Sequence, residues 1–345
     1  MTKHLVTGAT GFLGSAIVLE LLDRHPYDTV TCLIRGSAEG LTTHLWNCAA
    51  AYGRAGLGEH FASRVATITA DVTDPRSLER ITGRFDAVWH SAGSLRWDEQ
   101  AREQTTAVNL GGTANMVALA RRCQAQDFTY LSTAYVAGST GRPAPEVPAA
   151  AQAARSPYEA SKIGAEAVVL AAEGPRCRIL RPSIVVGHSL TQAAPGTRAG
   201  FYGVVEILRR TARRGDPGPA LLDFRDDAVT NMVPIDTVAR EAVDLHQAKA
   251  FGIFHLTHPE PIGSQDAVLA IAEALGLPEP AFGTPTRPRD LAMRRYLDPF
   301  LRMVNHGGNR FERRNTDQHV QPIGHPVLGR RQARELAAWY LAQAG

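Results

Sequence analysis

The sequence predicts an α/β fold, with a doubly wound parallel sheet followed by a smaller C-terminal substrate-binding lobe. Three observations predict it: short apolar runs alternate with helical patterns in the first half, a glycine-rich turn follows the first run, and the alternation weakens after Pro182. A chain of 345 residues is long enough for both parts. We expect residues 1–185 to form the sheet domain and residues 186–345 the lobe, with segment 230–260 returning to the core sheet.

The apolar runs of the first half have the length and the β-branched composition of buried strands. These predicted strands are Lys3 to Thr7, Thr29 to Ile34, Val65 to Thr69, Asp86 to His90, Phe128 to Ser132 and Cys177 to Arg181. The predicted helices are Phe12 to Arg24, Gly40 to Arg54, Arg76 to Thr82, Glu99 to Gln124 and Pro157 to Ala172. Crossovers between parallel strands are nearly always right-handed, so helices should cover both faces of the sheet.

The second half is less regular. Residues 187–230 are rich in Gly, Pro and Arg and predict loops around one helix. The segment Ala144 to Arg155 predicts a mobile Ala/Pro loop. The elements expected beyond Pro182 are a helix at Val204 to Arg214, a strand at Gly252 to Thr257, a helix at Gln265 to Ala274 and a last helix at Gln332 to Ala344.

Composition narrows the class of protein. The sequence has no apolar run as long as a membrane span and no signal-peptide pattern, so we expect a cytoplasmic protein without membrane or nucleic-acid partners. The cysteines and histidines have no metal-ligand spacing, which predicts no metal site. Net charge is +3, and arginine is concentrated between Arg287 and Arg334, where it could meet a phosphate or an acidic protein or simply form a solvated face.

The turn after the first strand predicts a dinucleotide site. It reads Thr7-Gly8-Ala9-Thr10-Gly11-Phe12-Leu13-Gly14 and leads into an apolar helix. Gly8 permits the tight turn, Gly11 lets the backbone approach a pyrophosphate, and Gly14 allows the helix and strand to pack closely. The helix N-terminus then faces the phosphates. The order of strand, turn and helix makes this a specific signal.

Residues that follow the second and third predicted strands bear on the choice between NAD and NADP as cofactor. Arg35 ends the second strand at a position where an acidic residue would accept from the ribose 2′-hydroxyl of NAD, whereas an arginine suits a 2′-phosphate. The sequence therefore predicts NADPH. Asp71, before Val72, could lie beside the adenine amine or could cap the helix that starts near Arg76.

Tyr158 and Lys162 predict an acid catalyst. The chain has only three lysines, and one of them follows a tyrosine by four residues on a predicted helix. That spacing puts both side chains on one face. A nearby cation lowers the pKa of a phenol, which would make Tyr158 a usable proton donor near neutral pH. The spacing alone is also compatible with a solvated helix face.

Taken together, these motifs resemble the extended short-chain dehydrogenase/reductases over roughly residues 3 to 260. The matching pieces are Thr7 to Gly14, Ala70-Asp71-Val72, His90-Ser91-Ala92-Gly93, Asn109 to Thr113, Leu131 to Tyr135, Tyr158 to Lys162 and Arg181-Pro182-Ser183. The resemblance implies an NADP-binding Rossmann domain. It implies cofactor contacts from Gly8, Thr10, Gly11, Phe12, Leu13, Gly14, Arg35, Asp71, Val72, Ser91, Ala92, Gly93, Lys162, Pro182 and Ser183.

The same resemblance implies a catalytic tetrad. Tyr158 would be the general acid, and Lys162 would lower its pKa and hold the nicotinamide ribose. Thr133 would hydrogen-bond the substrate oxygen, and Asn109 would support a proton relay behind Lys162. A carbonyl that receives hydride needs two fixed donors at its oxygen, and Thr133 and Tyr158 can supply them.

Two details favour one branch of this superfamily. The insertion at residues 37–64, with its helix and Gly56-Leu57-Gly58, is similar to carrier-protein thioester reductases and fatty acyl-CoA reductases. Ala134 and Tyr135 follow Thr133 where sugar dehydratases place an acid pair. Ser91-Ala92 and the segment Leu95 to Asp98 depart from the common pattern next to the expected nicotinamide and substrate.

The leading hypothesis is therefore an NADPH-dependent reductase of an acyl thioester or the derived aldehyde, free or tethered to a carrier protein. The alternatives are a ketone or aldehyde reductase on a free small molecule, a sugar-nucleotide epimerase, and a non-catalytic NADPH sensor. The arginines proposed to meet a phosphopantetheine phosphate or an acidic carrier are Arg294, Arg295, Arg310, Arg313 and Arg314. By analogy with relatives, a homodimer could pair through Glu99 to Gln124 and Pro157 to Ala172.

Overall fold

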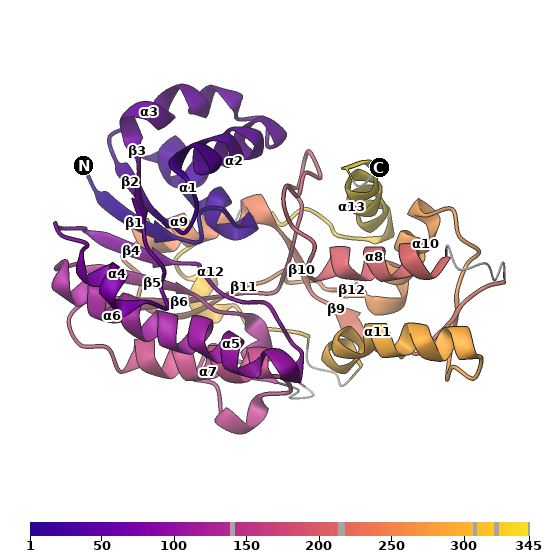
Figure 1. Ribbon diagram of the computed structural model, residues 1–345. Helices are drawn as coiled ribbons and strands as arrows, with labels where there is room; N and C mark the ends of the chain where they lie inside the picture. The colour runs from indigo at the N-terminus through magenta and orange to yellow at the C-terminus, as the bar shows by residue number, and fades with distance from the viewer. Residues whose placement is uncertain (139–141, 213–217, 306–308, 321–323, 344–345) are drawn as a thin grey trace.

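A seven-stranded sheet forms the centre of the computed structural model, which describes residues 1–138, 142–212, 218–305, 309–320 and 324–343 (Figure 1). Its strand order is β11-β6-β5-β4-β1-β2-β3, and every neighbouring pair is parallel. The strands are β1 (Lys3–Thr7), β2 (Thr29–Ile34), β3 (Val65–Thr69), β4 (Ala87–His90), β5 (Asp127–Leu131), β6 (Arg176–Pro182) and β11 (Gly252–Leu256). The order reverses between β1 and β4, the switch point at which doubly wound sheets bind ligands. The predicted fold class is confirmed.

Helices cover both faces of this sheet (Figure 1). One face carries α1 (Phe12–Arg24), α2 (Ala38–Ala51) and α9 (Ile235–Gln247), which pack into one hydrophobic cluster. The other face carries α4 (Pro75–Glu79), α6 (Gly112–Arg122) and α7 (Pro157–Leu170), which pack into a second. The predicted strands of the first half are all present, with ends displaced by at most one residue. The sequence prediction missed α9 entirely.

The predicted helix Glu99 to Gln124 is not continuous. It divides into a 3₁₀ turn η2 (Glu99–Ala101), α5 (Arg102–Thr106), a π-helical turn η3 (Ala107–Gly111) and α6. The π turn carries Asn109, and such turns are frequent at functional sites. Helical periodicity in the sequence does not reveal a single inserted residue, so this break was not predicted.

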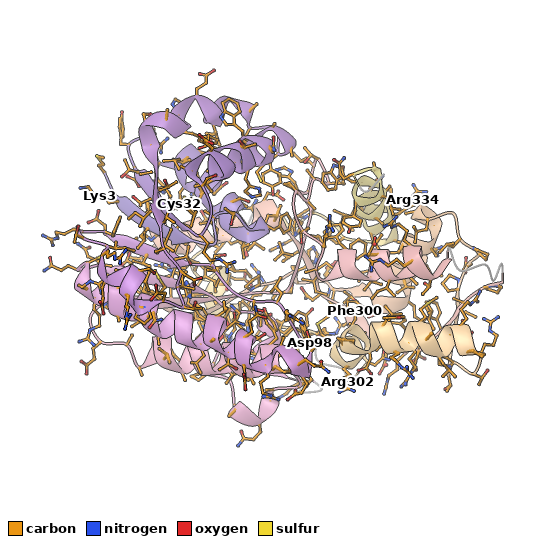
Figure 2. All side chains as sticks on the ribbon, in the orientation of Figure 1. Lys3, Cys32, Asp98, Phe300, Arg302 and Arg334 are labelled. Atoms are coloured by element: carbon orange, nitrogen blue, oxygen red, sulfur yellow. The ribbon has the colours of Figure 1, made fainter. Side chains whose placement is uncertain are left out.

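The C-terminal lobe lies beside the sheet domain. It contains helices α8, α10, α11 and α13, which lie close together (Figure 1). These helices are α8 (Phe201–Ala212), α10 (Ser264–Ala274), α11 (Pro288–Val304) and α13 (Arg330–Gln343), and they share one hydrophobic cluster. The prediction missed α11 because Pro299 lies inside it, and an interior proline normally ends or kinks a helix. Figure 2 shows the side chains around Phe300 of α11, on the side of the lobe that meets the sheet domain.

The chain crosses between the two parts more than once. β11 pairs with β6 as an edge strand of the main sheet, and α9 packs on α1. The segment Ala144 to Arg155, expected to be a mobile loop, is anchored at its start. The Ala144 amide donates to the Arg310 carbonyl at 2.9 Å, and the buried Glu146 carboxylate accepts from the His255 amide at 2.7 Å. These contacts connect it to both the sheet and the C-terminal segment.

Within the described residues, no helix combines the length and the apolar character needed to cross a lipid bilayer.

Candidate active site

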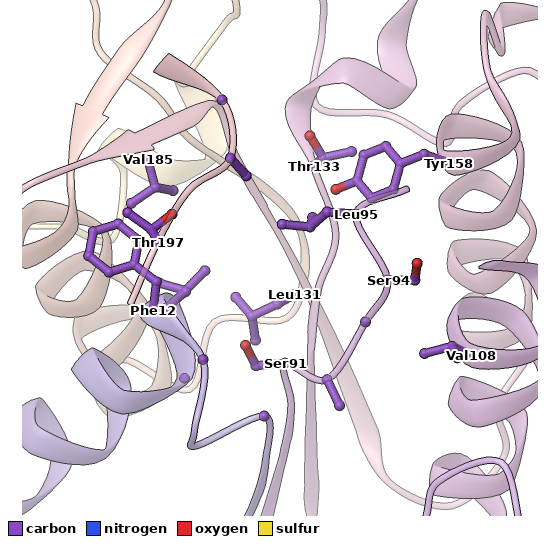
Figure 3. Close-up of a pocket in the computed structure, with 18 of the residues that line it drawn as sticks. Phe12, Ser91, Ser94, Leu95, Val108, Leu131, Thr133, Tyr158, Val185 and Thr197 are labelled. Atoms are coloured by element: carbon purple, nitrogen blue, oxygen red, sulfur yellow. The ribbon is translucent and has the colours of Figure 1, made fainter. Parts of the chain in front are cut away.

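A cavity of about 830 Å³ lies at the C-terminal ends of the strands, between the sheet and the lobe (Figure 3). It brings together almost all of the residues that the sequence singled out. The predicted site residues that line it are Gly8, Thr10, Gly11, Phe12, Leu13, Gly14, Arg35, Asp71, Val72, Ser91, Ala92, Gly93, Thr133, Tyr158, Lys162, Pro182 and Ser183. Asn109 lies behind this lining.

The glycine turn forms a close-packed cradle at one end of the cavity. Gly8 has φ +76°, and a Cβ there would lie 2.7 Å from the Ala92 amide nitrogen. A Cβ on Gly14 would lie 2.1 Å from the Gly8 carbonyl oxygen. Gly11 is the N-cap of α1 and supplies no side-chain cap, so the first amides of the helix stay available to an anion. The turn therefore fits the pyrophosphate of a dinucleotide.

Arg35 and Asp71 line the same end of the cavity. Arg35 is exposed, directly after β2. The Asp71 carboxylate accepts from the Thr73 amide at 2.8 Å and from the Thr73 hydroxyl at 2.7 Å. These bonds, with a smaller contribution from the positive charge of Arg35, hold the pKa of Asp71 below its ordinary value. The alternative that Asp71 caps the next helix is wrong, because Asp74 is the N-cap of α4.

Tyr158 and Thr133 approach each other in the cavity, away from Phe12 (Figure 3). Tyr158 lies in the first turn of α7, which the Ser156 side chain caps by accepting from the Glu159 amide at 3.2 Å. The Tyr158 hydroxyl is directed toward the Thr133 side chain (Figure 3). Burial raises the pKa of Tyr158 well above its ordinary value, and the neighbouring Thr133 side chain offsets only part of this effect. The phenol is therefore protonated across the physiological range.

Lys162 lies one turn after Tyr158, and its ammonium group is directed to β5. Its Nζ donates to the Leu131 carbonyl oxygen at 2.8 Å and lies 4.8 Å from the centre of the Tyr130 ring. Burial lowers the pKa of Lys162 to about 8, and Glu166 opposes this shift. In this structure burial dominates the pKa of Tyr158, and the Lys162 ammonium donates to a backbone carbonyl, so the expectation that Lys162 lowers the pKa of Tyr158 stays a prediction.

Asn109 holds the loop that follows β4. Its Oδ1 accepts from the Ser94 amide at 2.7 Å, and its Nδ2 donates to the Ser94 carbonyl at 3.0 Å and to the Ser161 hydroxyl at 2.9 Å. A Cβ on Gly93 would lie 3.1 Å from Asn109 Oδ1 and 3.4 Å from Lys162 Nζ. Asn109 therefore acts on the loop beside Lys162, and its predicted part in a proton relay stays a prediction.

Sequence reasoning missed three aromatic residues of the cavity lining. Trp97 stacks on Tyr158 with ring centroids 5.1 Å apart and an angle of 28° between the rings. Tyr296 and Phe300 of α11 also line the cavity. The unusual segment Leu95 to Asp98 was a signal for Trp97, whereas nothing in the sequence indicated α11.

Two of the C-terminal arginines expected to meet a phosphate have other partners. Arg313 is buried, where its guanidinium donates to Glu241 at 2.8 Å and to the Thr257 carbonyl at 2.6 Å. Arg294 donates to Asp223 at 2.7 Å. The expectation for Arg313 is wrong, because its charge is already neutralised inside the protein. The described part of the chain also holds no group of His, Cys, Asp or Glu arranged to bind a metal ion.

Residues 6–242, more than half of the chain, match the family described as Male sterility protein, a family of NAD-binding domains. The chain belongs to this family. The match begins within β1 and continues into α9, so it covers the glycine turn and the Tyr158 region. It confirms the prediction of an NAD(P)-dependent oxidoreductase of the extended short-chain type, without deciding between NAD and NADP.

Relatives of this Male sterility family member include several reductases. The chain is 27% identical over 265 residues to the L-2-aminoadipate reductase large subunit of Eremothecium gossypii, covering 69% of this chain and 18% of that protein. It is 26% identical over 317 residues to the 2-alkyl-3-oxoalkanoate reductase of Stenotrophomonas maltophilia, covering 87% of this chain and 84% of that protein. The chain thus spans less than a fifth of the first relative and most of the second.

Solved structures share the fold. The terminal R domain from the myxalamid PKS-NRPS biosynthetic pathway matches with TM-score 0.75 at 23% identity, over 99% of this chain and 90% of that one. A thiolation-reductase di-domain from an archaeal non-ribosomal peptide synthetase matches with TM-score 0.79 at 19% identity, over 99% of this chain and 75% of that one. At these identities the likeness establishes the fold alone.

Proposed function

We propose that this protein is an NADPH-dependent reductase of an acyl thioester, or of the aldehyde derived from it. The observation that carries the proposal is the pair of hydroxyl groups on Thr133 and Tyr158, which meet in a cavity between a dinucleotide cradle and an apolar wall. Two donors beside one reacting oxygen suit a carbonyl that becomes an oxyanion.

The residues of the glycine turn, together with Lys162 and Ser183, would hold the dinucleotide. When bound, the reduced cofactor supplies a hydride to the carbonyl carbon. Ser183 has a buried hydroxyl without a hydrogen-bond partner among the described residues, and it lines the cavity, so it offers an unused polar contact. Arg35 supports the choice of NADPH, because it is an exposed cation at the end of β2.

Two side chains of this protein would stabilise and neutralise the negative charge that develops on the carbonyl oxygen. Thr133 donates a hydrogen bond to the carbonyl oxygen, and Tyr158 donates its proton as the C–O bond becomes single, which gives a hemithioacetal. The raised pKa of Tyr158 keeps that proton in place until negative charge develops. The phenolate would then take back the proton of the hemithioacetal hydroxyl, which restores the carbonyl and breaks the C–S bond. The products are the aldehyde and a thiolate, which takes a proton from water to become the free thiol. A second reduced cofactor would supply the hydride that converts the aldehyde to the alcohol, and Tyr158, having given its proton to the alcohol oxygen, would regain one from water.

The names of the relatives support a thioester over other carbonyl compounds. They include an aminoadipate reductase, a terminal R domain from a PKS-NRPS pathway and a thiolation-reductase di-domain. The acyl group would therefore arrive on coenzyme A or on the phosphopantetheine arm of a carrier protein.

A second candidate is a reductase of a free keto acid. It is favoured by the relative named 2-alkyl-3-oxoalkanoate reductase, because the two proteins align over most of both chains. The same two donors would then serve a ketone, and no thiol would leave.

The deciding experiment follows the loss of NADPH absorbance with decanoyl-coenzyme A, a decanoyl-loaded carrier protein, decanal and a 2-alkyl-3-oxoalkanoate. The proposal expects release of free thiol in step with NADPH oxidation when a thioester is the substrate. Turnover of the keto acid without turnover of either thioester or decanal would favour the second candidate.

Replacing Tyr158 by Phe tests the acid in the same assay. Loss of a general acid should lower kcat by roughly 10²- to 10⁴-fold, while NADPH binding stays close to that of the original protein. The variant keeps the ring that Trp97 contacts, so a folding defect is not expected. Undiminished turnover would remove Tyr158 from the mechanism.

A further inference from the structure

We propose that Trp97 is the specificity-determining residue of an apolar acyl subsite, and that this subsite selects uncharged alkyl groups over acyl groups with a polar or charged end. The inference rests on the proposed function, since it names the substrate class for the same cavity. The evidence for it is the position of Trp97, which lies between Tyr158, the predicted general acid, and the lobe.

Trp97 contacts both sides of the cavity. Its indole covers one face of the Tyr158 ring, with 5.1 Å between the ring centroids. The same side chain is half-buried against the hydrophobic cluster of the lobe, the cluster that contains α8, α10, α11 and α13. A group attached to a carbonyl carbon beside the Tyr158 hydroxyl would therefore meet the indole first.

The loop that carries Trp97 is fixed from both ends. Asn109 binds both backbone groups of Ser94, and the Ser94 hydroxyl lies 3.3 Å from that of Thr105. On the other side, the Thr105 hydroxyl donates to the Arg96 carbonyl at 3.5 Å. A wall that is held in one position can discriminate between substrates by shape, whereas a mobile side chain would adapt to each of them.

The rest of the subsite wall consists of apolar residues from two helices. Val204 and Ile207 come from one turn of α8, and Tyr296, Phe300 and Met303 recur along one face of α11. Among the described lining residues of α8, α11 and the Ser94 to Trp97 loop, none carries a charge. A charged group placed here would lose its hydration without gaining a partner, which disfavours it strongly.

Two sets of thioesters test the inference. One set carries straight alkyl chains from butanoyl to decanoyl, and the matched set ends in a carboxylate. The original protein should prefer the alkyl member of a long-chain pair by more than about tenfold in kcat/KM, because each poorly matched group in an apolar pocket has an effect of this size. Trp97→Ala should reduce that preference toward unity, and Trp97→Phe should largely preserve it.

The control variant is Trp46→Ala. Trp46 is a partly exposed indole on α2 that makes an edge-to-face contact with Phe61 and does not line the cavity, so its loss should leave the preference unchanged. If Trp97→Ala kept the alkyl preference of the original protein, or if the original protein reduced the carboxylate set equally well, the inference would be overturned.

A binding measurement separates this inference from the proposed function. Decanol should change the tryptophan fluorescence of the original protein, and the change should be absent in Trp97→Phe. If no thioester or aldehyde were reduced but this Trp97-dependent signal were present, the proposed function would fail and the subsite would stand. If thioesters were reduced but decanol gave the same signal in both proteins, the subsite would fail alone.

Discussion

The ammonium nitrogen of Lys162 lies 2.8 Å from the carbonyl oxygen of Leu131 and donates a hydrogen bond to it. Tyr158, one turn earlier on the same helix, instead faces Thr133 (Figure 3). Leu131, which ends β5, and Thr133, two residues later, therefore lie next to these two side chains. This arrangement keeps the acid and the lysine on one face of α7 without a direct contact between them.

The buried ammonium of Lys162 predicts a specific pH dependence of stability. Burial lowers its pKa to about 8 in the folded protein, against about 10.4 in an unfolded chain. Between these values the unfolded chain binds more protons, so this residue makes the free energy of unfolding rise with pH. Lys162→Met removes the titration, and its stability relative to the original protein should fall as pH rises from about 8 to about 10.

The measurement is denaturant unfolding of both proteins at several pH values in this window. Burial also raises the pKa of thiols such as Cys32, which lowers stability at high pH, but this contribution is common to both proteins and cancels in the difference. A difference that stays constant with pH would contradict the lowered pKa of Lys162.

Arg35 should set the cofactor preference. Arg35→Asp would replace a cation with a group that repels a 2′-phosphate, so the KM for NADPH should rise by roughly 10- to 100-fold, the value of a charge-assisted hydrogen bond. The KM for NADH should change much less. Steady-state kinetics with both cofactors check this, with Arg84→Asp as the control because Arg84 is exposed in the loop before β4 and outside the cavity lining. Equal effects on both cofactors would exclude the 2′-phosphate contact.

Gly14 should tolerate no side chain. The Cβ of Gly14→Ala would lie 2.1 Å from the Gly8 carbonyl oxygen, so α1 must move away from β1. Overpacking of this kind costs about 1–3 kcal/mol, and the displaced helix end should bind NADPH weakly. Unfolding curves and cofactor titration measure both effects. Gly36→Ala is the matched control, since nothing lies within 4 Å of its Cβ position. Normal NADPH affinity in Gly14→Ala would argue against the cradle.

Arg313 should matter for stability and not for carrier binding. Its buried pair with Glu241 has side-chain exposures of 5% and 1%, so Arg313→Ala would leave a buried carboxylate without its main partner. The expected loss is about 3–5 kcal/mol in the free energy of unfolding. Arg314→Ala, on the exposed neighbour, should change it by less than about 0.5 kcal/mol. A selective rise in KM for a carrier-bound substrate with unchanged stability would restore the role that the sequence suggested for Arg313.

Local patterns determined much of this protein in advance. The strands β1, β2 and β3 and helix α1 were predicted at their observed bounds, because period-2 and period-3.6 hydrophobicity and glycine chemistry act over a few neighbouring residues. The spacing of Tyr158 and Lys162 likewise placed both on one helix face. The order of the motifs along the chain predicted one cofactor site, and the residues expected to contact the cofactor line one cavity.

Only the tertiary structure decided what surrounds those residues. Arg313 and Glu241 are 72 positions apart, and no local pattern indicates that one neutralises the other. Helix α11 forms despite Pro299 because its apolar face packs into the lobe cluster, which outweighs a weak local preference. The pKa of Tyr158 rises and does not fall, because burial is the sum of contacts from distant segments. Spacing in the sequence determines which neighbouring side chains share a face of a helix or strand. The charge state and the specificity of those side chains depend on the tertiary packing around them.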